Sequence, residues 1–247
     1  GDFVIWLDTA KEYRNLYPNQ KITLIANPTW AGLARKLPYW DEVFVVDIPH
    51  LALKKLIKRW RLLISIRRLG FDTAIQPTFS RTIAGDSIVR ATGARHRIGS
   101  VGDLVNSTAQ ERQISNRWYT KLLPANNSQM MELLRNAEFF SSLAATFHQP
   151  ALPRLPRLCQ LPENLQLEEA YFIVFPGASW IGKQWPMGHF VEVLIKLQLQ
   201  YGWKPVLCGS VNEAELCQAI AHAAKLDCIN LAGETDIVEL TEVIRSA

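Results

Sequence analysis

The chain has 247 residues, of which 48% are hydrophobic and 20% are charged, and its net charge is +4. This composition excludes a disordered or fibrous protein, and no apolar run reaches the roughly 20 residues that a membrane-spanning helix needs. The four cysteines form no CxxC pair and have no histidine at metal-ligand spacing, which predicts reduced core residues. We therefore predict a soluble, intracellular protein.

The charge is divided unevenly along the chain. Residues 1–123 carry a net charge of +9, whereas residues 124–247 carry a net charge of −5. A basic half joined to an acidic half indicates two units with different partners, and an anionic partner is expected for the first half.

In the first half, helical and strand patterns alternate. Strands are predicted over 21–26, 42–47, 71–76 and from Arg97 to Ile98, and helices over 9–16, 51–69, 82–92 and 129–147.

A proline-rich stretch, 149–156, has three prolines in eight residues and predicts a linker. After it the pattern resumes, with helices capped by Asn212 and by Thr235. Strands that alternate with helices indicate parallel sheets. The expected domains are 1–150 and 169–247, joined by a linker over 151–168. The second half is predicted to have strands over 170–175, 205–208 and 229–231, and helices over 188–201, 212–225 and 235–246.

The segment 175–186 (FPGASWIGKQWP) connects a buried strand to a helix. Free N–H groups and a helix dipole meet at such a turn, which favours an anion, and Ser179 and Lys183 add a hydroxyl and a charge. The ordinary alternative is a plain turn in which Gly177 and Gly182 supply backbone freedom. The spacing approaches a nucleotide-binding Walker A loop, but Gln184 replaces the Ser or Thr that holds magnesium, so we reject that assignment.

The next two strands also end in glycine, at Gly209 and Gly233. Glu213 follows the first of these, either as an acid that suits the start of a helix or as a carboxylate that binds ribose hydroxyls. Thr235 follows the second. Together the three strand ends predict one crevice at the carboxyl edge of a parallel sheet, and the absence of GxGxxG disfavours a nicotinamide enzyme.

The predicted helix 51–69 contains seven Lys or Arg residues and no acid. One interpretation is a solvated basic face on a helix packed through its apolar residues. The other is an arm that meets anionic lipid headgroups or an acidic acceptor. The packing residues in the first interpretation are Leu53, Ile57, Trp60 and Ile64, and the candidate contacts in the second are Lys54, Lys55, Lys58 and Arg59.

These segments, in this order, resemble glycosyltransferase family 9, the ADP-heptose:lipopolysaccharide heptosyltransferases. The resemblance covers nearly the whole chain, and the step from a Pro-Gly-Ala turn to Lys-x-Trp-Pro is its most specific part. The matching residues are Gly1-Asp2, Tyr17-Pro18, Asp41 to Val43, Val46-Asp47, Phe71 to Ile75, Arg97 to Gly99, Phe175 to Ser179, Lys183 to Pro186, Gly209-Ser210 and Asn230 to Gly233.

The resemblance implies a GT-B fold, in which two Rossmann-like domains with parallel sheets face each other across a cleft. The first domain would bind the acceptor, and Asp2, otherwise a helix-capping acid, would be the catalytic base. The second, incomplete domain would bind the nucleotide-sugar. There Ser179 and Lys183 would hold the diphosphate and Glu213 the ribose, with no metal and no cofactor besides the substrate. Gly177, Gly209, Gly233 and Thr235 complete the expected donor site.

The implied activity is inverting transfer of a sugar, heptose from ADP-heptose first of all, to a lipopolysaccharide core or related envelope glycan. The alternatives are another nucleotide-sugar donor, or a non-catalytic module that binds anionic lipid or another polyanion. The resemblance also implies a cytoplasmic bacterial enzyme, peripheral on the inner membrane, that binds no nucleic acid. An Asp-Thr-Gly segment followed by His is lacking after Ser246, and a strand is lacking before Gly1, so we expect truncation at both ends and weigh an inactive fragment.

Overall fold

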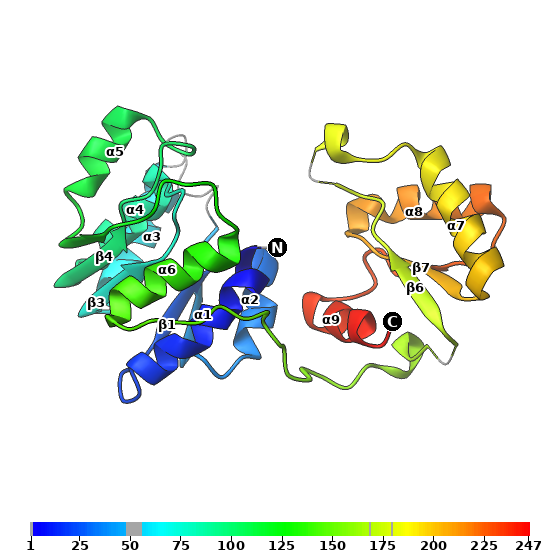
Figure 1. Cartoon of the computed structure of the whole chain (residues 1–247), viewed down its shortest axis with the longest axis horizontal. Helices are drawn as coiled ribbons and strands as arrows, with labels where there is room; N and C mark the ends of the chain where they lie inside the picture. The colour runs from blue at the N-terminus through cyan, green and yellow to red at the C-terminus, as the bar shows by residue number, and fades with distance from the viewer. Residues whose placement is uncertain (1, 48–55, 168, 179) are drawn as a thin grey trace. The chain divides into compact units, whose positions relative to one another are not determined.

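The computed structural model describes residues 2–47, 56–167, 169–178 and 180–247. The chain divides into two compact units, Gly1–Arg154 and Leu155–Ala247 (Figure 1). The division falls within the proline-rich stretch. In the described ranges, no helix combines the length and the apolar character that crossing a bilayer requires.

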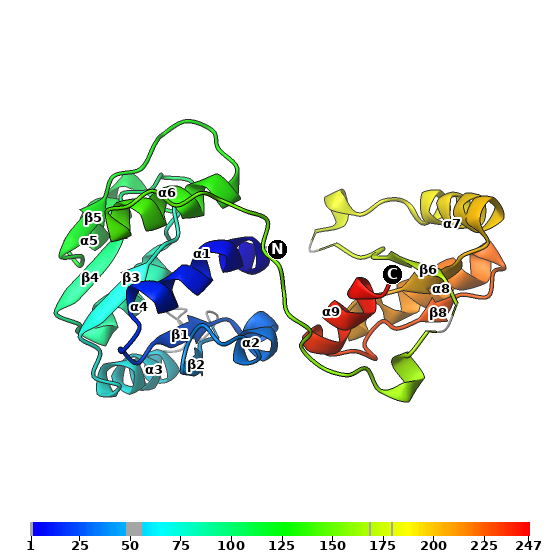
Figure 2. The same cartoon turned by 60° about the horizontal axis from the view of Figure 1, so that its bottom comes forward.

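Unit 1, Gly1–Arg154, contains a two-stranded sheet, β1-β2, and a three-stranded sheet, β3-β4-β5, and every pair of strands is parallel. Figure 2 shows α6 and α3 on opposite sides of these strands. The strands are β1 (Thr23–Ala26), β2 (Glu42–Val45), β3 (Thr73–Gln76), β4 (His96–Ser100) and β5 (Lys121–Leu123); the helices are α1 (Asp2–Leu16), α2 (Pro28–Arg35), α3 (Leu56–Arg68), α4 (Ile83–Thr92), α5 (Ala109–Asn116) and α6 (Glu132–Ala144).

Helix α4 was predicted correctly because residues at its two ends mark its start and its stop. The Thr82 side chain caps its first turn by accepting a hydrogen bond from the Gly85 N–H, and Gly93 ends it with a left-handed φ of 58°. Both devices are visible in the sequence, and the predicted helix is confirmed. Helix α1 is longer than predicted, because it begins at Asp2 rather than at Thr9.

Three elements of unit 1 were not predicted. Helix α2 begins with Asn27 as its cap and Pro28 in its first turn, and Thr108 and Glu111 form a reciprocal capping box on α5. These are recognised start signals that the hydrophobic pattern alone does not reveal. Strand β5 has only three residues, so its period is too short to detect.

Helix α3 packs through a different face from the one predicted. Ile66 is fully buried, and Leu62 and Leu63 pack with residues of α4. Ile57 and Trp60, expected to be packing residues, are 71% and 67% exposed, and Ile64 is also exposed. The packing prediction was therefore wrong for these three side chains. Leu53 lies outside the described residues.

Unit 2, Leu155–Ala247, contains one parallel sheet in the order β6-β7-β8. The predicted strands and helices of this half are confirmed, with shifts of at most two residues at their ends. The elements are β6 (Tyr171–Val174), β7 (Lys204–Leu207) and β8 (Ile229–Asn230), the helices α7 (Met187–Tyr201), α8 (Ala214–Ala224) and α9 (Ile237–Arg245), and three short 3-10 turns, Glu163–Leu165, Ile181–Lys183 and Val211–Glu213.

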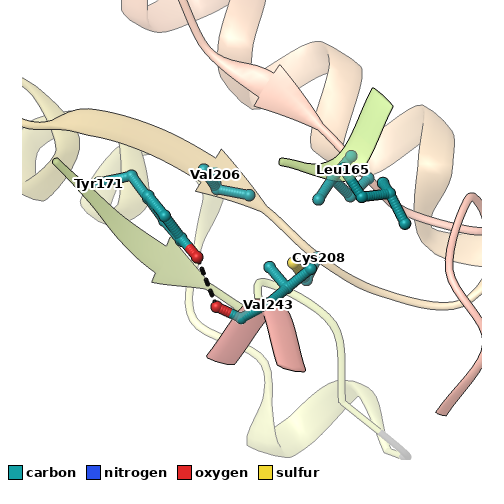
Figure 3. Close-up of a cluster of buried hydrophobic side chains, with 6 residues drawn as sticks. Leu165, Tyr171, Val206, Cys208 and Val243 are labelled. Atoms are coloured by element: carbon teal, nitrogen blue, oxygen red, sulfur yellow. Dashed lines mark hydrogen bonds between the residues drawn. The ribbon is translucent and has the colours of Figure 1, made fainter. Parts of the chain in front are cut away.

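The core of unit 2 lies on both faces of β7. Val206 and Cys208 belong to a buried cluster with Tyr171 and Val243, and the Tyr171 hydroxyl donates a 2.6 Å hydrogen bond to the Val243 carbonyl (Figure 3). Leu207 points the other way, into a second cluster formed with residues of α7 and α8. Because successive side chains of a strand alternate in direction, the continuous apolar run of β7 fits a strand covered on both faces.

Two predicted helix caps of unit 2 are wrong. Helix α9 is capped by Asp236, whose side chain accepts from the N–H groups of Val238 and Glu239, and not by Thr235. Asn212 does not cap α8, because it lies inside the 3-10 turn Val211–Glu213 that precedes that helix. At α9 the side chain next to the predicted one accepts hydrogen bonds from the N–H groups of the first turn, whereas α8 has no side-chain cap among the described residues.

Candidate functional site

The predicted crevice of unit 2 is built from the loops that follow its three strands. Gly177 follows β6, Gly209 follows β7 and Gly233 follows β8. The Gly233 N–H donates a 3.0 Å hydrogen bond to the Gly209 carbonyl, which joins the last two loops. The carboxyl ends of parallel strands meet at one edge, and ligands of open α/β sheets bind there.

The Glu213 carboxylate lies between the first two loops. A methyl group added at Gly177 would lie 1.5 Å from Glu213 Oε1, and one added at Gly209 would lie 3.0 Å from Oε2. Gly177 has no left-handed φ, so close approach of the carboxylate, and not backbone freedom, explains this glycine. The prediction that Gly177 and Gly182 supply backbone freedom is therefore wrong: at Gly182 the space is taken by the ring of Trp180.

One oxygen of Glu213 is fixed by its neighbour. Oε2 accepts hydrogen bonds from the Ser210 N–H at 2.6 Å and from the Ser210 hydroxyl at 2.8 Å. The same two residues form a capping box on the turn Val211–Glu213, so the helix-start role weighed for Glu213 is present. Ser210 was not predicted as a site residue, although Ser-x-x-Glu is the sequence signature of this box.

Among the described residues, Lys183 and Thr235 form no hydrogen bond or ion pair with this cluster. Lys183 is exposed at the end of the 3-10 turn Ile181–Lys183, and among the described residues none forms an ion pair with it. Thr235 precedes α9 and is half-buried. Ser179 lies outside the described residues, so its predicted contact is not placed. The structure therefore brings Gly177, Gly209, Glu213 and Gly233 together.

In unit 1, Asp2 is exposed in the first turn of α1 and lines a cavity of about 1180 Å³. Glu132, in the first turn of α6, lines the same cavity. Loss of solvent raises the pKa of the Glu132 carboxyl, and the nearby charge of Asp2 raises it further. Two carboxylates therefore share this region, and only Asp2 was predicted.

The basic helix is only partly described. Lys54 and Lys55 lie outside the described residues. Lys58 is exposed and Arg59 half-buried on α3, and this helix, Leu56–Arg68, has five basic residues and no acid.

A family model for glycosyltransferase family 9 (heptosyltransferase) matches residues 59–247. The chain belongs to glycosyltransferase family 9. No curated protein matches the chain by sequence.

Solved structures have the same fold as this family 9 chain. The E. coli ADP-heptose lps heptosyltransferase II matches with a TM-score of 0.68 and 22% identity over 100% of this chain and 74% of that one. E. coli heptosyltransferase WaaC with ADP-2-deoxy-2-fluoro heptose gives 0.72 and 17%, covering 100% and 77%. A family 9 glycosyl transferase from Veillonella parvula gives 0.69 and 16%, covering 98% and 69%. The α/β fold with parallel sheets is thus that of the heptosyltransferase structures.

Proposed function

We propose that the chain is an inverting glycosyltransferase that moves heptose from ADP-heptose onto a lipopolysaccharide core or a related envelope glycan. The observation that carries the proposal is the Glu213 carboxylate, seated on Gly177 and Gly209 at the carboxyl edge of the unit 2 sheet. The donor is suggested by the WaaC structure, which was determined with an ADP-heptose analogue.

The donor would bind in unit 2. Since Ser210 holds Oε2 of Glu213, Oε1 is the oxygen left to accept hydrogen bonds from ribose hydroxyls. The exposed charge of Lys183, with the Ser179 hydroxyl, would bind the diphosphate, next to Gly233 and Thr235. Lys183 would then stabilise the negative charge of the leaving nucleoside diphosphate, so the proposed reaction uses neither a metal nor a further cofactor.

The acceptor would be activated by Asp2. Its carboxylate takes the proton of an acceptor hydroxyl, while that oxygen forms a bond to the anomeric carbon of the donor. The bond from the same carbon to the diphosphate oxygen breaks, and the electron pair leaves with the nucleoside diphosphate. A single displacement of this kind inverts the configuration at the anomeric carbon.

An acceptor of this class is anchored in lipid, and α3 offers a surface for the membrane. Exposed Ile57 and Trp60 lie beside Lys58 and Arg61, which combines apolar and basic contacts on one helix. We place the enzyme in the cytoplasm, peripheral on the inner membrane, with anionic lipid headgroups and no nucleic acid as partners. Lys54, Lys55 and Arg59 are the other proposed contacts.

The proposal is tested first by binding, which does not require an active chain. ADP titrated into the protein by calorimetry should bind, and Glu213→Gln should weaken binding by about tenfold, because one charged hydrogen-bond acceptor is lost. Glu239→Gln is the matched control, since Glu239 has the same capping role on α9 and lies outside the crevice. Equal ADP affinity for all three proteins would remove the ribose role of Glu213.

Turnover is tested next, with ADP-heptose and a heptose-deficient lipopolysaccharide acceptor. Released ADP and the mass of the product report transfer, and the anomeric configuration reports inversion. Asp2→Asn should bind ADP normally and transfer 10²- to 10⁴-fold more slowly, which is the usual contribution of a positioned base. If transfer occurs only from a different nucleotide-sugar, the glycosyltransferase activity is supported and ADP-heptose as the donor is contradicted.

A second candidate function, binding without catalysis, rests only on the exposed apolar and basic side chains of α3. The chain would then be a non-catalytic module that binds anionic lipid or another polyanion. Binding to anionic vesicles without any affinity for ADP would favour this module over the transferase.

A further inference from the structure

Unit 1 presents a second carboxylate beside the proposed base. Glu132 and Asp2 are both exposed, both lie in the first turn of a helix, and both line the same cavity. We propose that Glu132 and the amide of Asn136 together hold one hydroxyl of the acceptor, next to the hydroxyl that Asp2 deprotonates. The acceptor is then a sugar with two adjacent free hydroxyls. This inference rests on the proposed transferase and defines the acceptor chemistry of its site.

Helices α1 and α6 bring the two carboxylates to the same end of unit 1. They lie side by side (Figures 1 and 2), and the ring of Tyr13 on α1 is 5.3 Å from the ring of Phe140 on α6. Asp2 lies about three turns before Tyr13 and Glu132 about two turns before Phe140, at about 1.5 Å per residue. Loss of solvent and the charge of Asp2 raise the pKa of the Glu132 carboxyl, against the opposite effect of Arg135. The two acids therefore interact, and one ligand can contact both.

The Glu132 carboxylate is not used by the start of its own helix. In α5 and α9 the first-turn residues Glu111 and Glu239 accept hydrogen bonds from the backbone N–H of the capping residue. The capping residue of α6 is Met131, which makes no side-chain cap hydrogen bond. Within the described parts of the chain, no group donates a hydrogen bond to the Glu132 carboxylate or forms an ion pair with it. Both of its oxygens are therefore left to accept hydrogen bonds from a ligand.

Asn136 supplies the hydrogen-bond donor that a hydroxyl ligand needs. It lies one turn after Glu132 on α6, so the two side chains share one face of the helix. Asn136 is 5% exposed and lines the same cavity, and no described residue accepts a hydrogen bond from its Nδ2. A buried donor without a partner costs free energy, so it points to an acceptor atom brought by a ligand. A hydroxyl both donates and accepts, which matches one carboxylate and one amide N–H.

The charges at this position select the class of ligand. Two carboxylates disfavour a phosphate or a carboxylate group between them, because like charges destabilise each other. Neutral hydroxyls on adjacent carbons of a sugar ring fit instead, one on each acid. Glu132 then determines which hydroxyl of the acceptor faces Asp2, and it takes no proton itself.

The first test measures acceptor binding, which does not require turnover. Heptose-deficient lipopolysaccharide, deacylated to make it water-soluble, is titrated into the 247-residue chain by calorimetry. Glu132→Gln should weaken binding by about tenfold, because a charged hydrogen-bond acceptor is lost, and Glu132→Asp should recover part of that loss. Glu111→Gln is the matched control, since Glu111 is a first-turn acid of α5 that does not line the cavity. Equal affinity of Glu132→Gln and the parent, or no binding by the parent, overturns the proposal.

Asn136 provides a test that separates binding from folding. Asn136→Leu keeps nearly the same volume and removes a donor that has no partner in the described chain. We expect the urea midpoint of unit 1 to stay the same or rise, while acceptor affinity falls about tenfold. A lower midpoint with unchanged affinity assigns Asn136 to the fold and overturns its role in the proposal.

Turnover separates the roles of the two acids. Glu132→Gln should raise KM for the acceptor about tenfold and change kcat much less, whereas Asp2→Asn should lower kcat. A fall in kcat without a change in KM for Glu132→Gln overturns the proposal. ADP binding is measured on the same proteins, so the two proposals can fail separately. A parent that binds the acceptor through Glu132 but does not bind ADP contradicts the transferase and supports this site. A parent that binds ADP but not the acceptor contradicts this inference alone.

Discussion

The two units differ in how completely their parallel sheets are built. In unit 2, β7 pairs with a strand on each side, and Val206 and Leu207 are buried on opposite faces. In unit 1, β1 and β3 each pair on one side only, within the described residues, and border a large cavity.

The difference bears on where each unit gains its stability. A central strand buries side chains on both faces and satisfies its backbone on both edges, so it contributes packing and hydrogen bonds together. A strand with an open edge contributes on one side only. We therefore expect substitutions in β7 to affect unfolding more than matched substitutions in β1, and the following predictions test this comparison.

The largest effect is expected at Leu207. Leu207→Ala should lower the free energy of unfolding of unit 2 by about 2–5 kcal/mol, because it leaves a hole in a closed core. Leu24→Ala is the matched change in β1 and should cost only about 1 kcal/mol, since Leu24 already borders the cavity. Urea unfolding, with hydrogen exchange to separate the two units, measures both values. Equal losses would contradict the comparison.

The next effect concerns the crevice. Gly177→Ala places a methyl group on Glu213 Oε1 and should weaken ADP binding by about 100-fold, since the carboxylate must move and leave Ser210. Gly188→Ala is the control because a methyl group there meets nothing within 4 Å. Calorimetric titration with ADP should show no change for the control. Unchanged ADP affinity for Gly177→Ala would contradict the proposal that the nucleotide binds in this crevice.

A smaller effect is expected at the two ends of the proline-rich stretch, where each unit has a buried carboxylate. In unit 1, Asp8 accepts from the Ala151 N–H at 3.0 Å and contacts His148 at 3.1 Å. In unit 2, Glu242 accepts from the Leu158 N–H at 2.8 Å. Asp8→Asn should destabilise unit 1 by about 2 kcal/mol at pH 7, which urea unfolding measures. Glu242→Gln should act on unit 2 alone.

The sign of the pH dependence follows from the pKa of Asp8. Burial by itself would raise this pKa, but hydrogen bonds from Ala151, His148 and Lys11 outweigh it, so the net pKa lies below the ordinary value. A lowered folded-state pKa gives stability that is present above the unfolded value, near pH 4, and is lost as the pH falls through the folded value. Asp8→Asn should remove this acid-side loss. An unchanged acid transition would contradict the assignment.

The smallest effect concerns α3. Replacing Lys58 and Arg59 by Gln should weaken binding to anionic vesicles by roughly 30-fold at low salt, since each basic residue near such a surface contributes about 1 kcal/mol. The matched double variant replaces Arg95 and Lys121, which are exposed basic residues of unit 1 outside α3. Co-sedimentation should also show less binding by the parent at 1 M salt, where the Debye length is ~3 Å. Equal vesicle binding by both variants would contradict the membrane role and favour the interpretation of α3 as a solvated basic face.

The sequence alone determined most of the α/β elements and the positions of the strand-end glycines. The signals used were the alternating apolar runs, Gly93 after α4 and the prolines of 149–156. Each acts on the backbone of its own segment, so it predicts local structure without knowledge of the fold. The family was also readable, because its motifs occur in a fixed order along the chain, and the match over residues 59–247 confirms it.

Only the tertiary structure decided which side of α3 is buried and what Gly177 is for. Ile57 and Ile66 are equally apolar in the sequence, yet one is 71% exposed and the other is fully buried, because α4 covers a single face of the helix. Gly177 and Glu213 are 36 positions apart, so their contact exists only once β6 and β7 pair. Local chemistry specifies helices, strands and caps; contacts between distant segments depend on how the strands are ordered in the sheet, which no local signal encodes.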